Sequence, residues 1–172
     1  MNTLPSRKPN RIPNFDYSSI NFYFFTVCAK DKQHHFGRLT DSQFIPNQIG
    51  KIIDRVWNEL TDKFAGIELD CFQTMPNHVH GIIALNHHPL FRAANTPAGL
   101  GQIIGAFKAK VNLLTRQQIF PKRHKIELWQ KTYYDRVIRN EQELLETREY
   151  IVNNPAKWEL DEYYWKRAGT GA

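Results

Sequence analysis

The sequence is poor in cysteine and lacks any long apolar segment. Its two cysteines, Cys28 and Cys71, lie in apolar runs without the spacing of a metal-binding or redox pair, so we expect buried, reduced thiols. No apolar run approaches the roughly 18 residues that a membrane span needs. Residues 1–14 are polar and basic, unlike a secretory signal. These absences predict a cytoplasmic protein that does not enter a membrane.

The composition is that of an ordinary folded domain. Hydrophobic residues make up 41% of the chain and charged residues 23%, which excludes the disordered class. A chain of 172 residues can bury one core, and no internal repeat or linker divides it. We expect a basic arm at 1–19, one domain at 20–158 and a tail at 159–172.

Positive charge is concentrated in one part of the chain. The formal net charge is +6, and between residues 101 and 140 only Glu127 and Asp135 are acidic. The basic residues of this stretch are Lys108, Lys110, Arg116, Lys122, Arg123, Lys125, Lys131, Arg136 and Arg139. Such a segment is typical of a surface that binds nucleic acid, and equally of a solvated basic face.

The predicted elements follow the order β-α-β-β-α-β, with one helix added at the end. Hydrophobic periodicity places strands at 20–29, 67–74, 80–85 and 128–138, and helices at 46–64, 98–117 and 140–153. This order is that of the ferredoxin-like split βαβ arrangement. We therefore expect an α+β sandwich with an antiparallel central sheet and an added C-terminal helix.

A histidine pair opens the third predicted strand. His78 and His80 are two residues apart, so in a strand both imidazoles point to the same face. Such a pair can ligate one divalent cation, but the same pattern also occurs at exposed strand edges. The remaining adjacent histidines fall in polar loops and are expected to be exposed to solvent: His34, His35, His87 and His88.

A tyrosine and an asparagine share one face at the end of the last predicted helix. Tyr150 and Asn154 are four residues apart, just before Pro155. A phenol with a pKa near 10 is a poor nucleophile unless a neighbouring metal draws charge from its target. The asparagine amide could supply an oxygen ligand to that metal. Alternatively, Tyr150 anchors the helix and Asn154 ends it.

Aromatic and cationic residues alternate in the segment 129–136. This interleaving suits a surface on which bases stack and phosphates pair with lysine or arginine. It suits a central strand with a buried aromatic row equally well.

Together these segments resemble the IS200-type single-tyrosine HUH transposases. Residues 75–80 (MPNHVH) resemble the histidine–hydrophobic–histidine motif that names the HUH class. Residues 128–135 and 139–155 resemble the closing segments of the REP-associated tyrosine transposase branch. The resemblance extends over 20–158.

The resemblance implies roles for four residues. His78 and His80 match the metal-binding pair, and Tyr150 matches the nucleophile. Asn154 matches the third metal ligand, where other branches carry glutamine. The implied cofactor is Mg²⁺ or Mn²⁺. Tyr133 and Tyr134 are rival phenols that lie outside the helix.

The activity implied is the cleavage and rejoining of single-stranded DNA at hairpins formed by REP-like palindromes, as in DNA transposition. The attacking tyrosine becomes linked to the 5′ phosphate and a free 3′ hydroxyl is released. A monomer and a homodimer are both compatible with this activity. The residues expected to contact DNA are Lys108, Lys110, Lys131, Arg136, Arg139, Trp129, Arg7, Lys8 and Arg11.

Three other functions fit parts of the pattern. A domesticated, non-catalytic protein could bind hairpin DNA, although the intact set of four site residues argues against a lapsed site. A nucleotide-phosphate hydrolase would need a third histidine where Ile82 stands. A structural zinc site would need more histidine or cysteine ligands than the pair provides.

Overall fold

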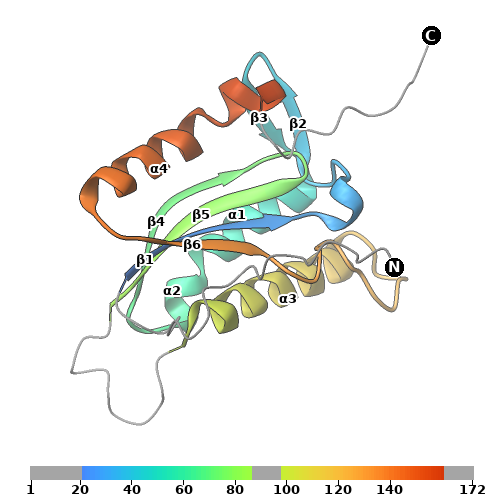
Figure 1. The fold of residues 1–172 in the computed structure, drawn as a ribbon. Helices are drawn as coiled ribbons and strands as arrows, with labels where there is room; N and C mark the ends of the chain where they lie inside the picture. The colour runs from blue at the N-terminus through green and yellow to red at the C-terminus, as the bar shows by residue number, and fades with distance from the viewer. Residues whose placement is uncertain (1–20, 87–97, 161–172) are drawn as a thin grey trace, which may run out of the picture.

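The central sheet has the strand order of the expected ferredoxin-like fold. The computed structural model describes residues 21–86 and 98–160 (Figure 1). Its sheet is antiparallel, in the order β4-β5-β1-β6. These strands are β1 (Asn21–Cys28), β4 (Ile67–Thr74), β5 (His78–Leu85) and β6 (Tyr134–Ile138). The α+β class and the split βαβ arrangement are thus confirmed.

Helices cover both faces of the sheet. They are α1 (Gln48–Asn58), α2 (Leu60–Lys63), α3 (Leu100–Gln118) and α4 (Glu141–Asn153). Figure 1 shows α1 and α3 on one side of the sheet and α4 on the other. No helix in the described ranges is long and apolar enough to cross a membrane.

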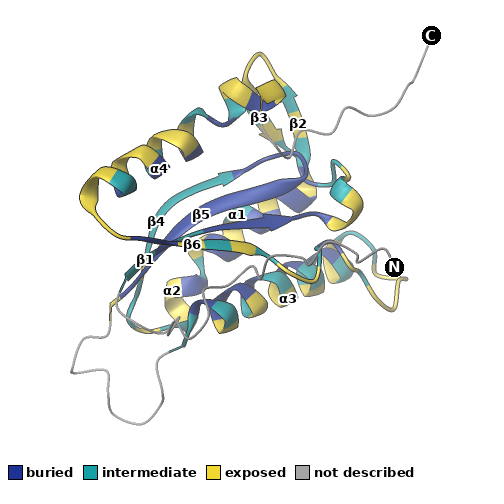
Figure 2. Ribbon diagram, viewed as in Figure 1, coloured by how far each residue is buried: buried dark blue, intermediate teal, exposed yellow. Residues whose placement is uncertain are grey.

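Alternation along the strands divides the core between these two layers. In β1, Tyr23 and Phe25 belong to the large core with α1 and α3, whereas Phe22 and Phe24 pack in the smaller core beneath α4. All eight residues of β5 are buried, as the dark strand in Figure 2 shows. The strand is therefore covered on both faces, which is why its sequence is almost continuously apolar apart from the histidines.

Gly81 permits close packing across β5. A Cβ atom at this position would lie 2.6 Å from the ring of Phe25 and 3.1 Å from that of Phe72. Only glycine leaves room for both rings at this point, one residue beyond His80.

A two-stranded hairpin precedes α1 and was not predicted. It consists of β2 (Gly37–Thr40) and β3 (Gln43–Pro46). Each strand has four residues, too few to show a clear alternation, and Asp41 and Ser42 form the turn with positive φ angles of 51° and 60°. For this reason the predicted helix at 46–64 starts later than expected. It is also interrupted within its length, whereas its end near residue 64 is confirmed.

Pro46 completes β3, and the helix starts only after Asn47. The Asn47 side chain accepts hydrogen bonds from the backbone N–H groups of Ile49 and Gly50, at 2.9 and 3.0 Å. Such a side-chain cap satisfies free donors and sets the start of a helix. At the other end, the helical path is interrupted at Glu59, which separates α1 from the single turn of α2.

The last predicted strand is only half formed. Residues 128–133 leave the sheet, and only Tyr134–Ile138 pair with β1. The Lys108 ammonium donates to the carbonyl oxygens of Gln130 and Lys131, at 2.6 and 3.0 Å. Trp129 enters the core and forms an isolated bridge with Ala29. These tertiary contacts replace the pairing that the alternating sequence predicted.

The final helix is confirmed where it was predicted. The Asn140 side chain accepts from the backbone N–H of Glu143 at 2.8 Å, so it caps the start of α4. Leu144 and Ile151 bury the apolar side of α4 against the sheet. The helix ends at Asn153, before Pro155, and a 3-10 segment (Pro155–Leu160) follows.

The two cysteines are both free thiols, as predicted. Cys28 is buried and Cys71 is partly buried.

Candidate active site

The two histidines of β5 face the α4 layer and converge. Both side chains are fully buried, and their Nε2 atoms lie 2.9 Å apart. The strand alternation that places them on one face also turns Val79 toward the α1–α3 core. The pair is therefore an internal site and not two exposed histidines on a strand edge.

Asn77 determines which nitrogen of His78 carries the proton. Its Nδ2 donates to the Lys32 carbonyl oxygen at 3.1 Å, so its Oδ1 is the atom that faces His78. Since a carbonyl oxygen only accepts, His78 Nδ1 must donate across the 2.9 Å contact. The lone pair of neutral His78 is then on Nε2 and points at His80.

Thr26 and Phe24 of the neighbouring strand hold the second imidazole. Thr26 Oγ1 lies 2.8 Å from His80 Nδ1, and the hydroxyl is buried. The Phe24 ring stacks on His80 with 5.5 Å between ring centroids. The register of β1 and β5 pairs Thr26 with His80, so the contact follows from strand pairing. With Nδ1 bonded to Thr26, His80 Nε2 is the nitrogen turned toward His78.

The distance between the two Nε2 atoms suits a shared cation. Two nitrogens bound at right angles to one ion, at about 2.1 Å each, lie about 3 Å apart, close to the 2.9 Å found here. Two lone pairs at this distance repel unless a proton or a cation lies between them. The donor set therefore fits a divalent ion.

A third protein ligand from the described residues would have to be something other than histidine, cysteine or a carboxylate. Among residues 21–86 and 98–160, no group of three such side chains could hold a metal. Asn154 is the residue the sequence proposed. It is 2% exposed and forms the C-terminal cap of α4, one turn beyond Tyr150.

Tyr150 reaches the histidine pair from α4. Its hydroxyl lies 3.3 Å from His80 Nε2, and the two rings meet edge-on with centroids 5.2 Å apart. The side chain is 43% exposed, so the phenol is accessible from solvent although it touches a buried imidazole. The structure thus brings together His78, His80 and Tyr150, which are separated by about 70 residues in the sequence.

The rival tyrosines lie elsewhere. Tyr133 packs against the core of the α1–α3 layer. Tyr134 lies on β6, where it pairs with Thr26, so β1 separates it from His80. Tyr150, in contrast, contacts a site histidine directly, with its hydroxyl 3.3 Å from His80 Nε2.

Trp158 and His34 adjoin the site. The sequence left open whether Trp158 holds DNA, docks on the domain or covers the site, and it gave no indication of His34. The Trp158 ring lies 5.7 Å from the His78 ring and 5.9 Å from that of His34, centroid to centroid. Trp158 is buried and His34 is partly buried, so the prediction that His34 and His35 are solvent-exposed loop residues is wrong. His87 and His88 lie outside the described residues. Nothing in the spacing of these residues indicated the contact, which depends on how the end of α4 docks.

The basic segment does not form one surface. Lys110 of α3 pairs with Glu59 at 2.9 Å, on the side of the sheet away from Tyr150. Lys108 is partly buried, and burial lowers its pKa while its ammonium holds the 130–131 carbonyls. Trp129 is a core residue in contact with Phe36 and Phe107, so of the two interpretations of residue 129 the structure supports the buried one.

Other predicted DNA contacts remain at the surface. Lys131 is exposed near the histidine end of β1, since Gln130 N–H donates to the Cys28 carbonyl. Arg139 is exposed at the opposite end of the sheet. Arg136 lies over the Phe24 ring at 5.7 Å and donates to Thr147 of α4. The remaining three predicted contacts lie outside the described residues: Arg7, Lys8 and Arg11.

The fold is that of a tyrosine transposase. A REP-associated tyrosine transposase, solved bound to a REP hairpin, matches 83% of this chain and 70% of its own length with a TM-score of 0.53. The two sequences are 17% identical, so the match establishes the shared fold.

Sequence comparison places the chain in a family. An uncharacterized protein of Haemophilus influenzae is 35% identical over 173 residues, which cover 92% of this chain and 93% of the relative. The chain belongs to the same family as this Haemophilus influenzae protein. No protein-family model matches it.

Proposed function

We propose that the chain cleaves and rejoins single-stranded DNA at hairpin elements, as a single-tyrosine HUH transposase of the REP-associated branch. The observation that carries the proposal is the 3.3 Å contact between the Tyr150 hydroxyl and Nε2 of His80, which itself converges on His78. A nucleophile beside a two-imidazole metal site is the arrangement that phosphodiester cleavage by a phenol needs.

His78, His80 and Asn154 would hold Mg²⁺ or Mn²⁺. The lone pair deduced for His78 and the 2.9 Å separation of the Nε2 atoms support the histidine ligands. Asn154 would add an amide oxygen, a ligand type that both ions accept. When bound, the ion draws negative charge from the oxygens of the scissile phosphate and makes its phosphorus more electrophilic.

Tyr150 performs the covalent step. Its Oη attacks the phosphorus and forms a bond to it while the bond from phosphorus to the 3′ oxygen breaks. The phenol proton passes to solvent, which reaches the half-exposed side chain, and the departing 3′ oxygen takes a proton from water. One phosphodiester replaces another, so a 3′ hydroxyl can reverse the step without any further energy source.

The DNA recognised is a strand folded into a hairpin. The resemblance of the closing segments and the REP hairpin bound by the structural neighbour support this part of the proposal. Residues 20–158 would form the catalytic unit, with the basic arm at 1–19 and the tail at 159–172 as additions to it.

The proposal is tested by trapping the covalent intermediate. Purified protein is incubated with Mn²⁺ and hairpin oligonucleotides copied from palindromes beside its own gene, and denaturing gels are searched for a protein–DNA adduct. The adduct should be absent with Tyr150→Phe and retained with the control Tyr134→Phe, which removes an equally exposed phenol from β6. An adduct that survives Tyr150→Phe would contradict the assignment of the nucleophile.

The same experiment distinguishes the alternative of a domesticated binding protein. Tight hairpin binding without any adduct, under conditions where Mn²⁺ binds, would favour that alternative. Absence of both binding and adduct would contradict the proposed function.

A further inference from the structure

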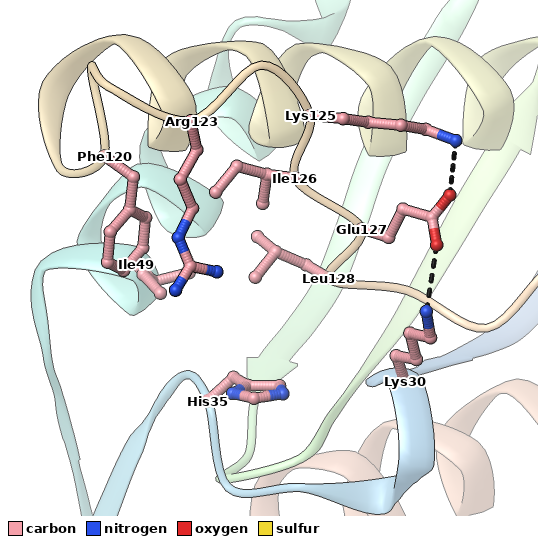
Figure 3. A pocket seen from close by; sticks show the side chains of 9 residues that line it. All are labelled: Lys30, His35, Ile49, Phe120, Arg123, Lys125, Ile126, Glu127 and Leu128. Atoms are coloured by element: carbon pink, nitrogen blue, oxygen red, sulfur yellow. Dashed lines mark hydrogen bonds and ion pairs between the residues drawn. The ribbon is translucent and has the colours of Figure 1, made fainter.

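A cavity lies outside the histidine site. It opens between the loop that follows α3 and the segment between β1 and β2, and its volume is about 500 Å³ (Figure 3). Lys30 and His35 line one side, Ile49 of α1 contributes to another, and Phe120, Arg123 and residues 125–128 complete the wall. This volume is in the usual range of small-ligand sites and suits a single nucleotide, not a duplex.

One wall of the cavity is apolar and aromatic. Figure 3 shows Phe120 and Ile49 beside Ile126 and Leu128, with the Arg123 side chain extending between them toward His35. The Arg123 guanidinium lies 5.2 Å from the centroid of the Phe120 ring. Bases of single-stranded nucleic acid stack on aromatic rings and on guanidinium planes of this kind.

The lining is positively charged overall. It contains three cations, Lys30, Arg123 and Lys125, and one carboxylate, Glu127. Glu127 forms ion pairs with both lysines, and Lys30 Nζ lies 2.9 Å from Glu127 Oε2. In the described part of the chain no carboxylate pairs with Arg123, so its charge remains available to an anion. A phosphate is the anion for which a planar guanidinium offers the best geometry.

His35 adds a hydrogen-bonding group next to this charge. It is partly buried, and burial lowers the pKa of its imidazole, which keeps the ring neutral near pH 7. A neutral imidazole has one donor and one acceptor nitrogen, which suits the edge of a base.

The cavity adjoins the same end of the sheet as the histidine pair. Phe36 N–H, next to His35, donates to the Pro76 carbonyl at 3.1 Å, and Ala29 N–H, next to Lys30, donates to the Asn77 carbonyl at 2.7 Å. The wall is thus hydrogen-bonded to the turn that leads into His78. The cavity wall and the histidine pair are therefore connected through a single turn at one end of the sheet.

We propose that this cavity binds one unpaired nucleotide of the DNA strand, with its base stacked on Phe120 beside His35 and its phosphate at Arg123. The inference rests on the proposed function, since it takes single-stranded DNA as the ligand. The bound nucleotide is not the one that is cut. It is a second point of attachment that helps to position the strand at Tyr150.

The test compares variants that change the cavity with one that changes only its charged surroundings. The probe is a fluorescent hairpin oligonucleotide with a single-stranded thymidine flank, followed by fluorescence anisotropy. Arg123→Gln removes the phosphate contact and Phe120→Leu removes the stacking ring, and each should weaken binding about tenfold. Lys122→Gln removes the same charge from an exposed neighbour that does not line the cavity, and should weaken binding about twofold at most. Equal losses for Arg123→Gln and Lys122→Gln would overturn the proposal.

An abasic scan then locates the nucleotide. Abasic sites are placed one at a time along the flank. With the unmodified protein, an abasic site at one position should lower the binding affinity about tenfold, and the other positions should have little effect. At that position Phe120→Leu should cause no further loss, because the base and the ring form one contact. The proposal would be overturned if every abasic position gave the same affinity. It would also be overturned if the losses from the abasic site and from Phe120→Leu added together.

Thymidine monophosphate distinguishes a substrate strand from a free nucleotide. Mononucleotide binding that Arg123→Gln abolishes, combined with unchanged oligonucleotide affinity, would overturn the assignment to the substrate strand. The adduct assay separates this inference from the proposed function. If the adduct forms but Arg123→Gln and Phe120→Leu do not change hairpin affinity, only the proposed nucleotide site is refuted. If these variants weaken hairpin binding but no adduct forms, only the proposed cleavage is refuted.

Discussion

Asn77 Oδ1 and His78 Nδ1 form a hydrogen bond of 2.9 Å between adjacent residues, and the direction of this bond determines the chemistry of the imidazole. Because Asn77 Nδ2 is bonded to the Lys32 carbonyl, only its oxygen can face the histidine. The tautomer of His78 is therefore set by a backbone carbonyl more than forty residues away in sequence.

Replacing Asn77 should weaken the metal site without removing a ligand. Asn77→Ala removes the acceptor that orients His78 Nδ1, so we expect about 10- to 100-fold weaker Mn²⁺ binding. Isothermal titration calorimetry measures this affinity. Asn86→Ala is the matched control, since it removes an asparagine side chain whose bond to Glu68 lies at the other end of β5. Unchanged Mn²⁺ affinity in Asn77→Ala would refute the orienting role.

Removing either site histidine should separate cleavage from DNA binding. His78→Ala and His80→Ala each remove a proposed ligand, and we expect adduct formation to fall by at least about 100-fold. Hairpin affinity should change by less than about threefold, because both side chains are buried and the exposed cations are elsewhere. Gel assays for the adduct and anisotropy for binding measure the two effects. Normal cutting by either variant would contradict the metal role.

The ion pair between Arg148 and Asp70 should hold the tyrosine helix on the sheet. Arg148 Nε donates to Asp70 Oδ1 at 2.8 Å, with a second guanidinium contact beside it. Because the arginine is 41% exposed, Arg148→Ala should lower the free energy of unfolding by only about 1 kcal/mol.

Its effect on chemistry should be larger than its effect on stability. Arg148 lies two residues before Tyr150, so we expect slower adduct formation at unchanged hairpin affinity. Urea unfolding and adduct kinetics measure the two quantities. Arg116→Ala, on α3 in the other layer, is the control. If both variants cut at the same rate, the pair has no positioning role.

The stability of the protein should respond to Glu127 at acid pH. Hydrogen bonds from Lys125 and Lys30 lower the pKa of Glu127 from 4.5 to about 2. A depressed pKa means that the folded state binds the proton less readily than the unfolded state. The stabilisation is therefore complete above pH 4.5 and is lost as the pH falls toward 2.

This contribution should disappear in Glu127→Gln. Urea midpoints measured between about pH 3 and about pH 6 should fall less steeply with decreasing pH in the variant than in the unmodified protein. Because the carboxylate is exposed, the difference should be small and should shrink in high salt. Identical curves for both proteins would contradict the assigned ion pairs.

Salt dependence should identify the cations that contact DNA. Hairpin affinity should fall steeply with salt, and Lys131→Gln should reduce the slope of log affinity against log salt by about 1. Lys110→Gln should leave the slope unchanged, because Lys110 is paired with Glu59 in the α1–α3 layer. A flat salt response of the unmodified protein would contradict a phosphate-binding surface.

Local sequence rules predicted much of this fold. The alternation of β5 places both histidines on one face, and the Asn140 cap with Pro155 sets the extent of α4. The helical spacing of Tyr150 and Asn154 follows in the same way. These features depend on residues a few positions apart, so the physics that determines them can be read along the chain.

The tertiary structure alone decided the rest. Thr26 meets His80 only because β1 pairs with β5 in one register. Trp158 lies against His78 only because the 3-10 segment after α4 docks there. From the sequence, Trp129 was equally suited to a DNA-binding surface and to the core. Its contacts with Phe36 and Phe107 show that it belongs to the core. The sequence by itself determined which residues share a face. Contacts between distant segments determined which faces meet, since the free energy of packing depends on partners that local patterns do not specify.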